Sequence, residues 1–210
     1  MYVKWMECRV KEGRKAAFSS AQEQWDSMAR APGFIAQAGG WDTQEENLAC
    51  IVAIWDNETA LSFFMKGQHD LIFTRNRQNE TYDSIQISHF HTLFGMKGSS
   101  QTLSKAIRQS KVLRIADCIV KRGREVHFET MQQEVWLPGM LSAGGMTGGC
   151  FSKNDNNSRN YLVSTFWDNE ENHERYKQER LPALQQQANI RQDLEEMKGR
   201  LIHLEDRWKI

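Results

Sequence analysis

The first ten residues alternate between two kinds of position with the period of a β-strand. Met6, Cys8 and Val10 share one side of the extended chain, whereas the opposite side carries the acidic Glu7. The pattern predicts a strand over residues 3–10 with one apolar side.

The next segment changes to the period of an amphipathic helix. Gly13 marks the turn out of the strand. Four apolar side chains then recur at steps of three and four residues: Phe18, Ala21, Trp25 and Met28. Pro32-Gly33 ends this helix, and the apolar runs at 34–41 and 48–55 follow, separated by a polar turn. This arrangement predicts a β-hairpin.

A second helix is expected after the hairpin. Asp56-Asn57-Glu58 supplies an N-cap and an acidic first turn. Apolar residues then fill one helical face: Ala60, Leu61, Phe64 and Met65. Residues 84–94 have the composition of a fourth strand, so the predicted order of elements is βαββαβ.

The same pattern occurs twice in the chain. Residues 7–14 recur in similar form as 117–124, and the tetrapeptide at 55–58 recurs without change at 167–170. A period of about one hundred residues indicates duplicated domains. In the second copy we expect strands at 145–151, 161–167 and 201–208, and a helix at 170–189.

The repeat predicts two domains, residues 1–97 and 111–210. The polar, aperiodic segment 98–110 is expected to be a linker. Each βαββαβ unit makes an antiparallel sheet with both helices on one face, and its other face must be covered. We therefore predict an α+β fold in which two tandem ferredoxin-like domains pack their sheets into a barrel within one chain. This would be a monomeric pseudo-dimer, and further pairing into a homodimer is left open.

The charge and composition of the chain argue against several classes of binding partner. The chain has 27 Lys and Arg against 27 Asp and Glu, so it lacks the positive field used by proteins that bind nucleic acid or anionic membranes. It shows neither a long apolar run nor the pattern of a signal peptide, and we expect a cytoplasmic protein. The four cysteines, none in a C-x-x-C pair, are expected to be reduced and buried in strands: Cys8, Cys50, Cys118 and Cys150.

The turn Pro32-Gly33-Phe34, the strand that ends at Trp55 and the helix start Asp56-Asn57-Glu58 together carry a family likeness. The sequence resembles the antibiotic biosynthesis monooxygenase-like domains of the dimeric α+β barrel superfamily, in duplicate, and is similar to an uncharacterised bacterial branch of them. The resemblance implies a pocket between sheet and helices that binds a small molecule. Members use this pocket for cofactor-free oxygenation, haem breakdown or isomerisation.

The haem-degrading members of that superfamily place an Asn on the first strand and a Trp and a His on the second helix. The matching positions here hold Met6, Phe64 and Thr74 in the first copy, and Ala116 and Tyr176 fill the first two in the second. The triad is absent, which argues against haem degradation. No cofactor is expected.

His69 and Asp70 are the predicted catalytic pair. A neutral imidazole beside a carboxylate can act as a general base, and the second copy has Leu181 and Pro182 at these positions. The alternative is an exposed or helix-capping histidine. Trp55, which recurs as Trp167, is expected to be a core residue or a wall of the substrate pocket.

Phe64 and Glu7 complete the predicted substrate pocket. Glu7 recurs as the acidic Asp117, so it is either a pocket acid or part of a salt bridge between the two copies. His89 and His91 share one face of a strand at the spacing of metal ligands, but two ligands do not make a site. We predict no metal.

Three functions therefore remain open. The first is a cofactor-independent monooxygenase-like enzyme that acts on a small aromatic or polyketide-like molecule, with His69 as the base. The second is a protein that binds or senses a small hydrophobic ligand without catalysis, and the third is a structural protein. Fold alone does not distinguish between them.

Overall fold

The computed structural model describes all residues, 1–210. The eight strands are β1 (Tyr2–Val10), β2 (Phe34–Asp42), β3 (Leu48–Trp55), β4 (Tyr82–Lys97), β5 (Val112–Val120), β6 (Met146–Asn154), β7 (Asn160–Trp167) and β8 (Leu194–Leu204). The helices are α1 (Lys15–Glu23), α2 (Glu58–Gly67), α3 (His69–Asn76), α4 (Leu103–Gln109), α5 (Glu125–Met131), α6 (Leu137–Ala143), α7 (Glu170–Glu179), α8 (Leu181–Gln187) and α9 (Ile190–Asp193). Mixed helices and antiparallel strands make this an α+β protein, as predicted.

The chain divides into two compact units. Unit 1 comprises Met1–His91 and Ile202–Ile210, and unit 2 comprises Thr92–Leu201. The long strands β4 and β8 contribute residues to both units, and the hydrogen-bonded order of strands is β1-β3-β2-β8-β5-β7-β6-β4. The division therefore differs from a simple cut between residues 97 and 111, because the C-terminal residues belong to unit 1.

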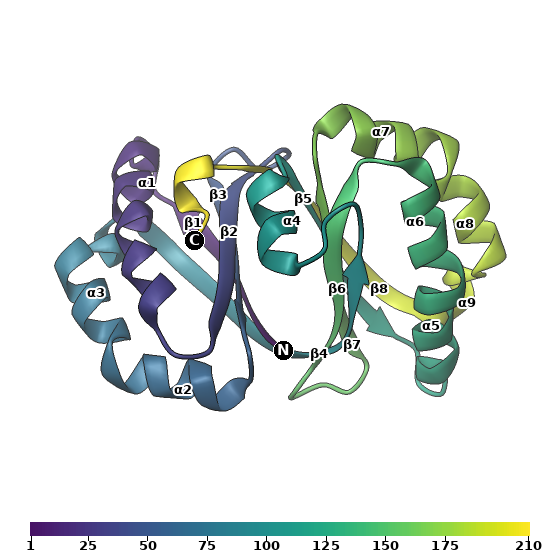
Figure 1. Cartoon of the computed structure of the whole chain (residues 1–210), viewed down its shortest axis with the longest axis horizontal. Coiled ribbons are helices and arrows are strands. Elements are labelled where there is room, and N and C mark those ends of the chain that lie inside the picture. Colours follow the sequence, from purple (N-terminus) through teal and green to yellow (C-terminus); the bar gives the residue numbers. More distant parts are fainter. The chain divides into compact units, whose positions relative to one another are not determined.

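Unit 1 contains a sheet with helices α1, α2 and α3 on one face (Figure 1). Strand β1 lies between β3 and β4, and β3 also pairs with β2. Every residue of β3 is buried, as its near-continuous run of apolar side chains requires. The Asn57 side chain caps α2 by accepting a hydrogen bond from the Ala60 amide, as the sequence predicts.

The C-terminal segment completes unit 1. We expected a strand over 201–208, but β8 runs from Leu194 to Leu204 and a short 3-10 helix, Asp206–Trp208, follows it. The Trp208 ring packs against Phe18, with a centroid distance of 5.6 Å, and is almost fully buried. Polar residues at the start of β8 concealed the strand, because it lacks a continuous apolar side.

The segment predicted to be a linker contains a helix. Thr102 caps α4 by accepting a hydrogen bond from the Lys105 amide, and Ala106 and Ile107 are buried. Thr147 of β6 donates a hydrogen bond to the Ala106 carbonyl at 3.2 Å. The short apolar stripe of α4 therefore packs within unit 2. The polar composition of the segment did not predict this helix.

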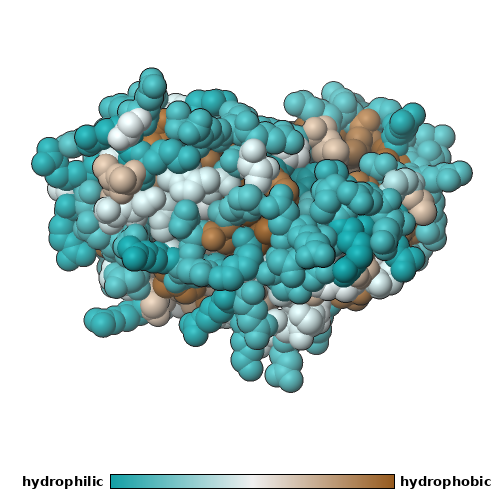
Figure 2. All heavy atoms as spheres, turned by 90° about the horizontal axis from the view of Figure 1, so that it is seen from above, coloured by the Kyte–Doolittle hydropathy of each residue, from teal (hydrophilic) through white to brown (hydrophobic).

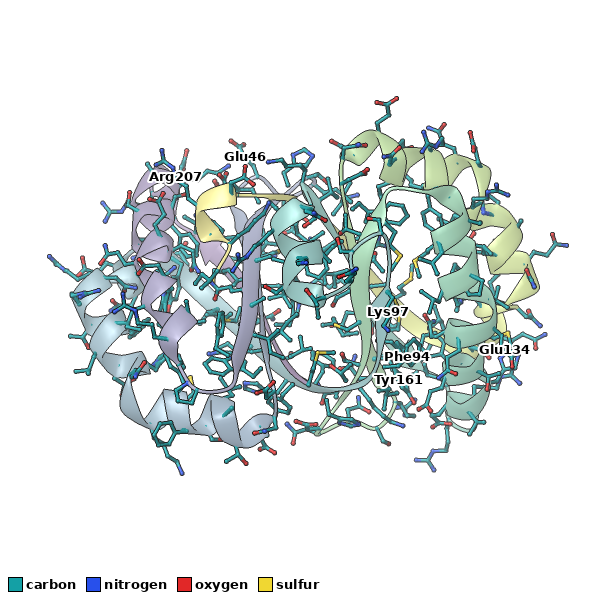
Figure 3. All side chains as sticks on the ribbon, in the orientation of Figure 1. Glu46, Phe94, Lys97, Glu134, Tyr161 and Arg207 are labelled. Atoms are coloured by element: carbon teal, nitrogen blue, oxygen red, sulfur yellow. The ribbon has the colours of Figure 1, made fainter.

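Unit 2 repeats the strand order of the first sheet, with β7 between β5 and β6. An aromatic cluster fills the space between its strands and α5: Phe94, Phe128, Phe151 and Tyr161. Figure 3 labels Phe94 and Tyr161, which lie close together there. The predicted helix over 170–189 is interrupted, because Pro182 begins a new helix, α8.

Hydrophilic residues cover most of the face seen in Figure 2. The most exposed large apolar side chains are separated in sequence: Phe63, Leu71 and Val126. None of the helices is both long and apolar enough to span a bilayer.

Candidate functional site

A cavity of about 280 Å³ lies in unit 1 between the sheet and its helices. Strands β1 and β3 form its floor through Lys4, Met6, Cys8, Ala53 and Trp55. Helices α2 and α3 contribute Leu61, Phe64, Met65, His69 and Phe73. The cavity reaches the surface at β4, where two of its lining residues, Ile85 and Ile87, are exposed.

Strand alternation selects which side chains face the cavity. Lys4 pairs with Ala53 across β1 and β3, and residues two apart on a strand share a face. Lys4, Met6 and Cys8 therefore point toward the helices. Glu7, which we predicted in the substrate pocket, lies on the opposite face of β1 and is not among the lining residues. On the same face of β1, Arg9 forms an ion pair with Glu45 at 2.9 Å.

His69 begins α3 and lines the cavity. Its Nδ1 lies 2.9 Å from Oδ1 of Asp70, and the imidazole side chain is 18% exposed. The Asp70 side chain is 87% exposed and does not line the cavity. Phe73 stacks on the imidazole with ring centroids 5.6 Å apart, and Trp25 packs at 5.3 Å. These contacts hold the imidazole ring of His69 beside the cavity, whereas the Asp70 carboxylate is exposed to solvent.

Trp55 and Phe64 form one wall, with ring centroids 5.1 Å apart. The Trp55 side chain is almost completely buried, and its indole Nε1 has no hydrogen-bond partner. A buried donor without a partner is uncommon and costs free energy. Trp25 differs, because its Nε1 donates to Gln78 Oε1 at 2.8 Å.

A network of buried amides supports the wall that contains Trp25. Gln78 donates through Nε2 to Gln22 Oε1 at 2.8 Å, and its backbone amide donates to Asn76 Oδ1 at 3.1 Å. Gln22, Trp25 and Gln78 all line the cavity. Because these amides bind one another, they hold the wall in one arrangement.

Lys4 is the residue that the sequence analysis missed. It is only 8% exposed, and its Nζ donates to the thioether Sδ of Met65 at 3.6 Å. Burial lowers the pKa of this ammonium below its usual value, although the nearby Cys8 opposes that effect. The signal was present in the sequence, because Lys4 shares the apolar side of the predicted strand with Met6 and Cys8.

The cysteines do not provide a nucleophile in this site. All four are buried as free thiols. Burial raises the pKa of the Cys8 thiol to about 12, so it remains protonated near neutral pH.

His89 and His91 lie on β4 outside the set of lining residues. The His89 ring stacks on Tyr2 with centroids 5.9 Å apart. No group of three or more His, Cys, Asp and Glu side chains is arranged to hold a metal ion.

Comparison of the amino-acid sequence with known proteins identifies a family. Residues 2–90 match the model of a domain of unknown function, DUF4937. The chain is also 39% identical over 90 residues to the uncharacterized protein YdbC of Bacillus subtilis, a match that covers 42% of this chain and 76% of YdbC. The chain belongs to the DUF4937 family.

Solved structures share the fold of this DUF4937 protein across nearly its whole length. Two are named "putative monooxygenase": one from Lactobacillus acidophilus (TM-score 0.73, 14% identity, 97% of this chain and 93% of that one) and one from Fusobacterium nucleatum (0.79, 11%, 97% and 91%). An anthrone oxidase-like protein has a TM-score of 0.69 at 10% identity, over 97% and 90% of the chains. The chain thus shares the fold of these solved proteins, a mixed α+β fold with antiparallel strands, as the sequence indicated.

Unit 2 of the DUF4937 protein has different side chains at the positions that correspond in the sequence repeat. Arg114 replaces Lys4, and Nη1 of Arg114 donates to the Arg200 carbonyl at 3.2 Å. His173 replaces Leu61 and packs edge-on against Trp167 at 5.3 Å. Burial, with a smaller effect from Arg114, lowers the pKa of His173 to about 4. The Trp167 indole donates to Thr165 at 3.1 Å, so it has the partner that Trp55 lacks.

Proposed function

We propose that this protein is a cofactor-independent monooxygenase-like enzyme whose substrate, a small aromatic or polyketide-like molecule, binds in the cavity of unit 1. One observation carries the proposal: an imidazole with a carboxylate partner lines an apolar cavity together with Trp55 and Phe64. An apolar cavity with few polar groups is typical of sites for small molecules. The names of proteins with this fold add support, because several are called monooxygenases or oxidases.

The proposed chemistry begins with proton abstraction. When Nδ1–H of His69 donates to Asp70, the lone pair on Nε2 is available to accept a proton from an acidic C–H or O–H of the substrate. The resulting carbanion or phenolate is electron-rich and transfers electrons to O₂. For anthrone the balance is C₁₄H₁₀O + O₂ → C₁₄H₈O₂ + H₂O: the methylene carbon gains one oxygen atom and becomes the second carbonyl, and the other oxygen atom leaves as water with the two methylene hydrogens.

Anthrone oxidation tests the proposal directly. The measurement is O₂ consumption and the appearance of anthraquinone, with the uncatalysed rate subtracted. The account expects turnover by the wild type and a loss of 10²-fold or more in kcat for His69→Gln, as is typical for removal of a general base. His203→Gln, which changes an exposed histidine of β8, is the control and should keep the wild-type rate. Equal turnover by His69→Gln and the wild type would rule out His69 as the base.

Ligand binding without catalysis is the second candidate function. The high exposure of Asp70 favours it, because a solvent-exposed carboxylate gives the imidazole little help as a base. A binding protein would show ligand-dependent thermal stabilisation that survives His69→Gln, with no O₂ consumption by either protein.

The repeated sequence supports a further part of the proposal. Residues 1–97 and 111–210 would be two tandem ferredoxin-like βαββαβ copies, with their sheets packed as one barrel in a single chain. The protein would then be a cytoplasmic monomer. Sedimentation equilibrium should give the mass of one chain, 24.4 kDa, and a mass of twice that value would show a homodimer.

A further inference from the structure

One lysine lies in the lining of the cavity without a carboxylate beside it. Lys4 is the only Lys or Arg among the lining residues, and none of them is Asp or Glu. The Lys4 ammonium contacts the neutral Met65 thioether as its side-chain acceptor. A buried cation without an anionic partner loses most of its hydration energy and gains little in return. A negatively charged ligand would supply the missing partner.

A donor without any acceptor belongs to another residue of the lining. Trp55 Nε1 is buried, has no acceptor and belongs to a residue that lines the cavity. Most buried indole N–H groups in folded proteins find a partner. An oxyanion can accept hydrogen bonds from both an ammonium and an indole, so one ligand group would satisfy both residues.

Strand register brings these two donors near each other. Lys4 pairs with Ala53 and Tyr2 pairs with Trp55 across β1 and β3. Lys4 and Trp55 are therefore diagonal neighbours on one sheet face, a relation in which the backbones lie roughly 7–8 Å apart. Both side chains project toward the helices that close the cavity. The cavity that both residues line has a volume of about 280 Å³.

We infer that the cavity selects a small anion with an apolar body, whose carboxylate or other acidic oxygen is held by Lys4 Nζ and the Trp55 indole N–H. This inference rests on the proposed function only in placing the ligand in this cavity. It narrows the substrate class from any small aromatic molecule to an aromatic acid or an aromatic compound that forms a stable oxyanion. The rest of the ligand would contact the apolar side chains of Met6, Phe64 and Phe73.

A matched pair of ligands tests the inference without any turnover. 1-Naphthoate and 1-naphthamide have nearly the same shape, but only the first is an anion at pH 7. Isothermal titration calorimetry of the wild type should show at least tenfold tighter binding of the acid. Equal affinities, tighter binding of the amide, or no detectable binding of the acid at millimolar concentration would each overturn the inference.

Three variants then assign the preference to residues. Lys4→Met should abolish the preference for the acid, and Trp55→Phe, which keeps an aromatic ring but removes the indole N–H, should reduce it several-fold. Lys66→Met changes an exposed lysine of α2 and should keep the wild-type preference. A preference that persists in Lys4→Met would contradict the assignment.

The design separates this inference from the proposed catalysis. His69→Gln should still prefer the acid by about the same factor, because the inference gives His69 no part in holding the anion. If the acid binds preferentially but anthrone is not oxidised, the inference stands and the enzyme proposal fails. If anthrone is oxidised but acid and amide bind equally, the enzyme proposal stands and the inference fails.

Discussion

Lys4 shows how burial changes the chemistry of a single residue. The sequence places a lysine among apolar strand positions, and the fold buries this lysine with its ammonium against the Met65 thioether. The pKa of Lys4 is therefore lowered in the folded protein, and a negatively charged ligand would stabilise its ammonium. His69 and Trp55 were predicted from the sequence as site residues, and both line the cavity. The strand alternation in the sequence puts Lys4 on the face of Met6 and Cys8, but its contact with Met65 of another element is visible only in the structure.

The Lys4→Met substitution should stabilise the folded protein at neutral pH. It replaces a buried, uncompensated charge with an apolar side chain of similar length, which is worth about 2 kcal/mol. The melting temperature should rise by about 4–8 °C in calorimetry. Between the lowered pKa and 10.5 the unfolded chain binds more protons at Lys4, so the stability of the wild type rises with pH there. The difference in stability between Lys4→Met and the wild type should therefore shrink as pH rises through that interval. A Lys4→Met protein that is less stable than the wild type at pH 7 would contradict this expectation.

His173 should make the stability of the protein sensitive to mild acid. Its pKa is about 4 in the folded chain against 6.5 for the unperturbed group, so the unfolded state binds more protons between these values. Stability is therefore lost as pH falls from 6.5 toward 4. His173→Leu introduces the leucine found at the equivalent position, Leu61. Between pH 6.5 and 4 the free energy of unfolding of this variant should fall by about 2–3 kcal/mol less than that of the wild type. Urea unfolding at several pH values measures it, and His203→Gln should follow the wild type.

The sequence repeat places a glycine before a strand at two corresponding positions. Gly33 and Gly145 precede β2 and β6 with positive φ angles of 75° and 84°. A Cβ at Gly33 would lie 2.5 Å from the Ala60 Cβ of α2, and one at Gly145 would lie 2.4 Å from the Asn172 Cβ of α7. Each glycine therefore lets a helix approach the start of a strand.

Gly33→Ala should destabilise the protein by about 2 kcal/mol, because it combines a left-handed backbone with a contact that forces α2 to move. Gly145→Ala should have a similar cost. Gly67→Ala is the control, since its Cβ would meet no atom within 4 Å, and it should be neutral or slightly stabilising. Guanidinium unfolding measures all three. Equal stabilities of the Gly33 and Gly67 variants would contradict the close helix contact.

The sequence predicts elements well where their apolar pattern is continuous. It located β1, β3 and β7 to within one residue, since each has a clear apolar run. It missed α4 and the first half of β8. Helix α4 buries only a short stripe at Ala106 and Ile107. The start of β8 carries exposed Glu195, Glu196 and Lys198, so no apolar period reveals it.

In the molecule as a whole, the last residues of the predicted second copy belong to unit 1. Residues 202–210 belong to unit 1, and the backbones of Gln37 and Ile210 exchange two hydrogen bonds of 3.1 Å. Arg207, labelled in Figure 3, lies 3.6 Å from Glu23 of α1. A local reading of the repeat could not predict this, because it assigns each strand to the copy in which it occurs.

Trp208→Ala should therefore destabilise unit 1, although it lies at the other end of the chain. The ring packs against Phe18 and Trp41 and is 1% exposed, so its removal leaves a large cavity worth about 3–5 kcal/mol. Arg207→Ala removes only an exposed ion pair and should change stability by less than about 0.5 kcal/mol. Hydrogen exchange should show faster opening of β2 in the Trp208 variant. Unchanged protection of β2 would show that the segment does not stabilise unit 1.

Binding of an anion beside Trp55 can be followed by NMR through the indole N–H signals of the seven tryptophans while 1-naphthoate is added. Trp55→Phe assigns the signal from the cavity of unit 1, and Trp167→Phe assigns its counterpart in unit 2. We expect a large, saturable shift of the Trp55 signal as its free N–H gains an acceptor, and little change at Trp167, which already donates to Thr165. A silent Trp55 signal, or a larger shift at Trp167, would show that the cavity of unit 1 is not the ligand site.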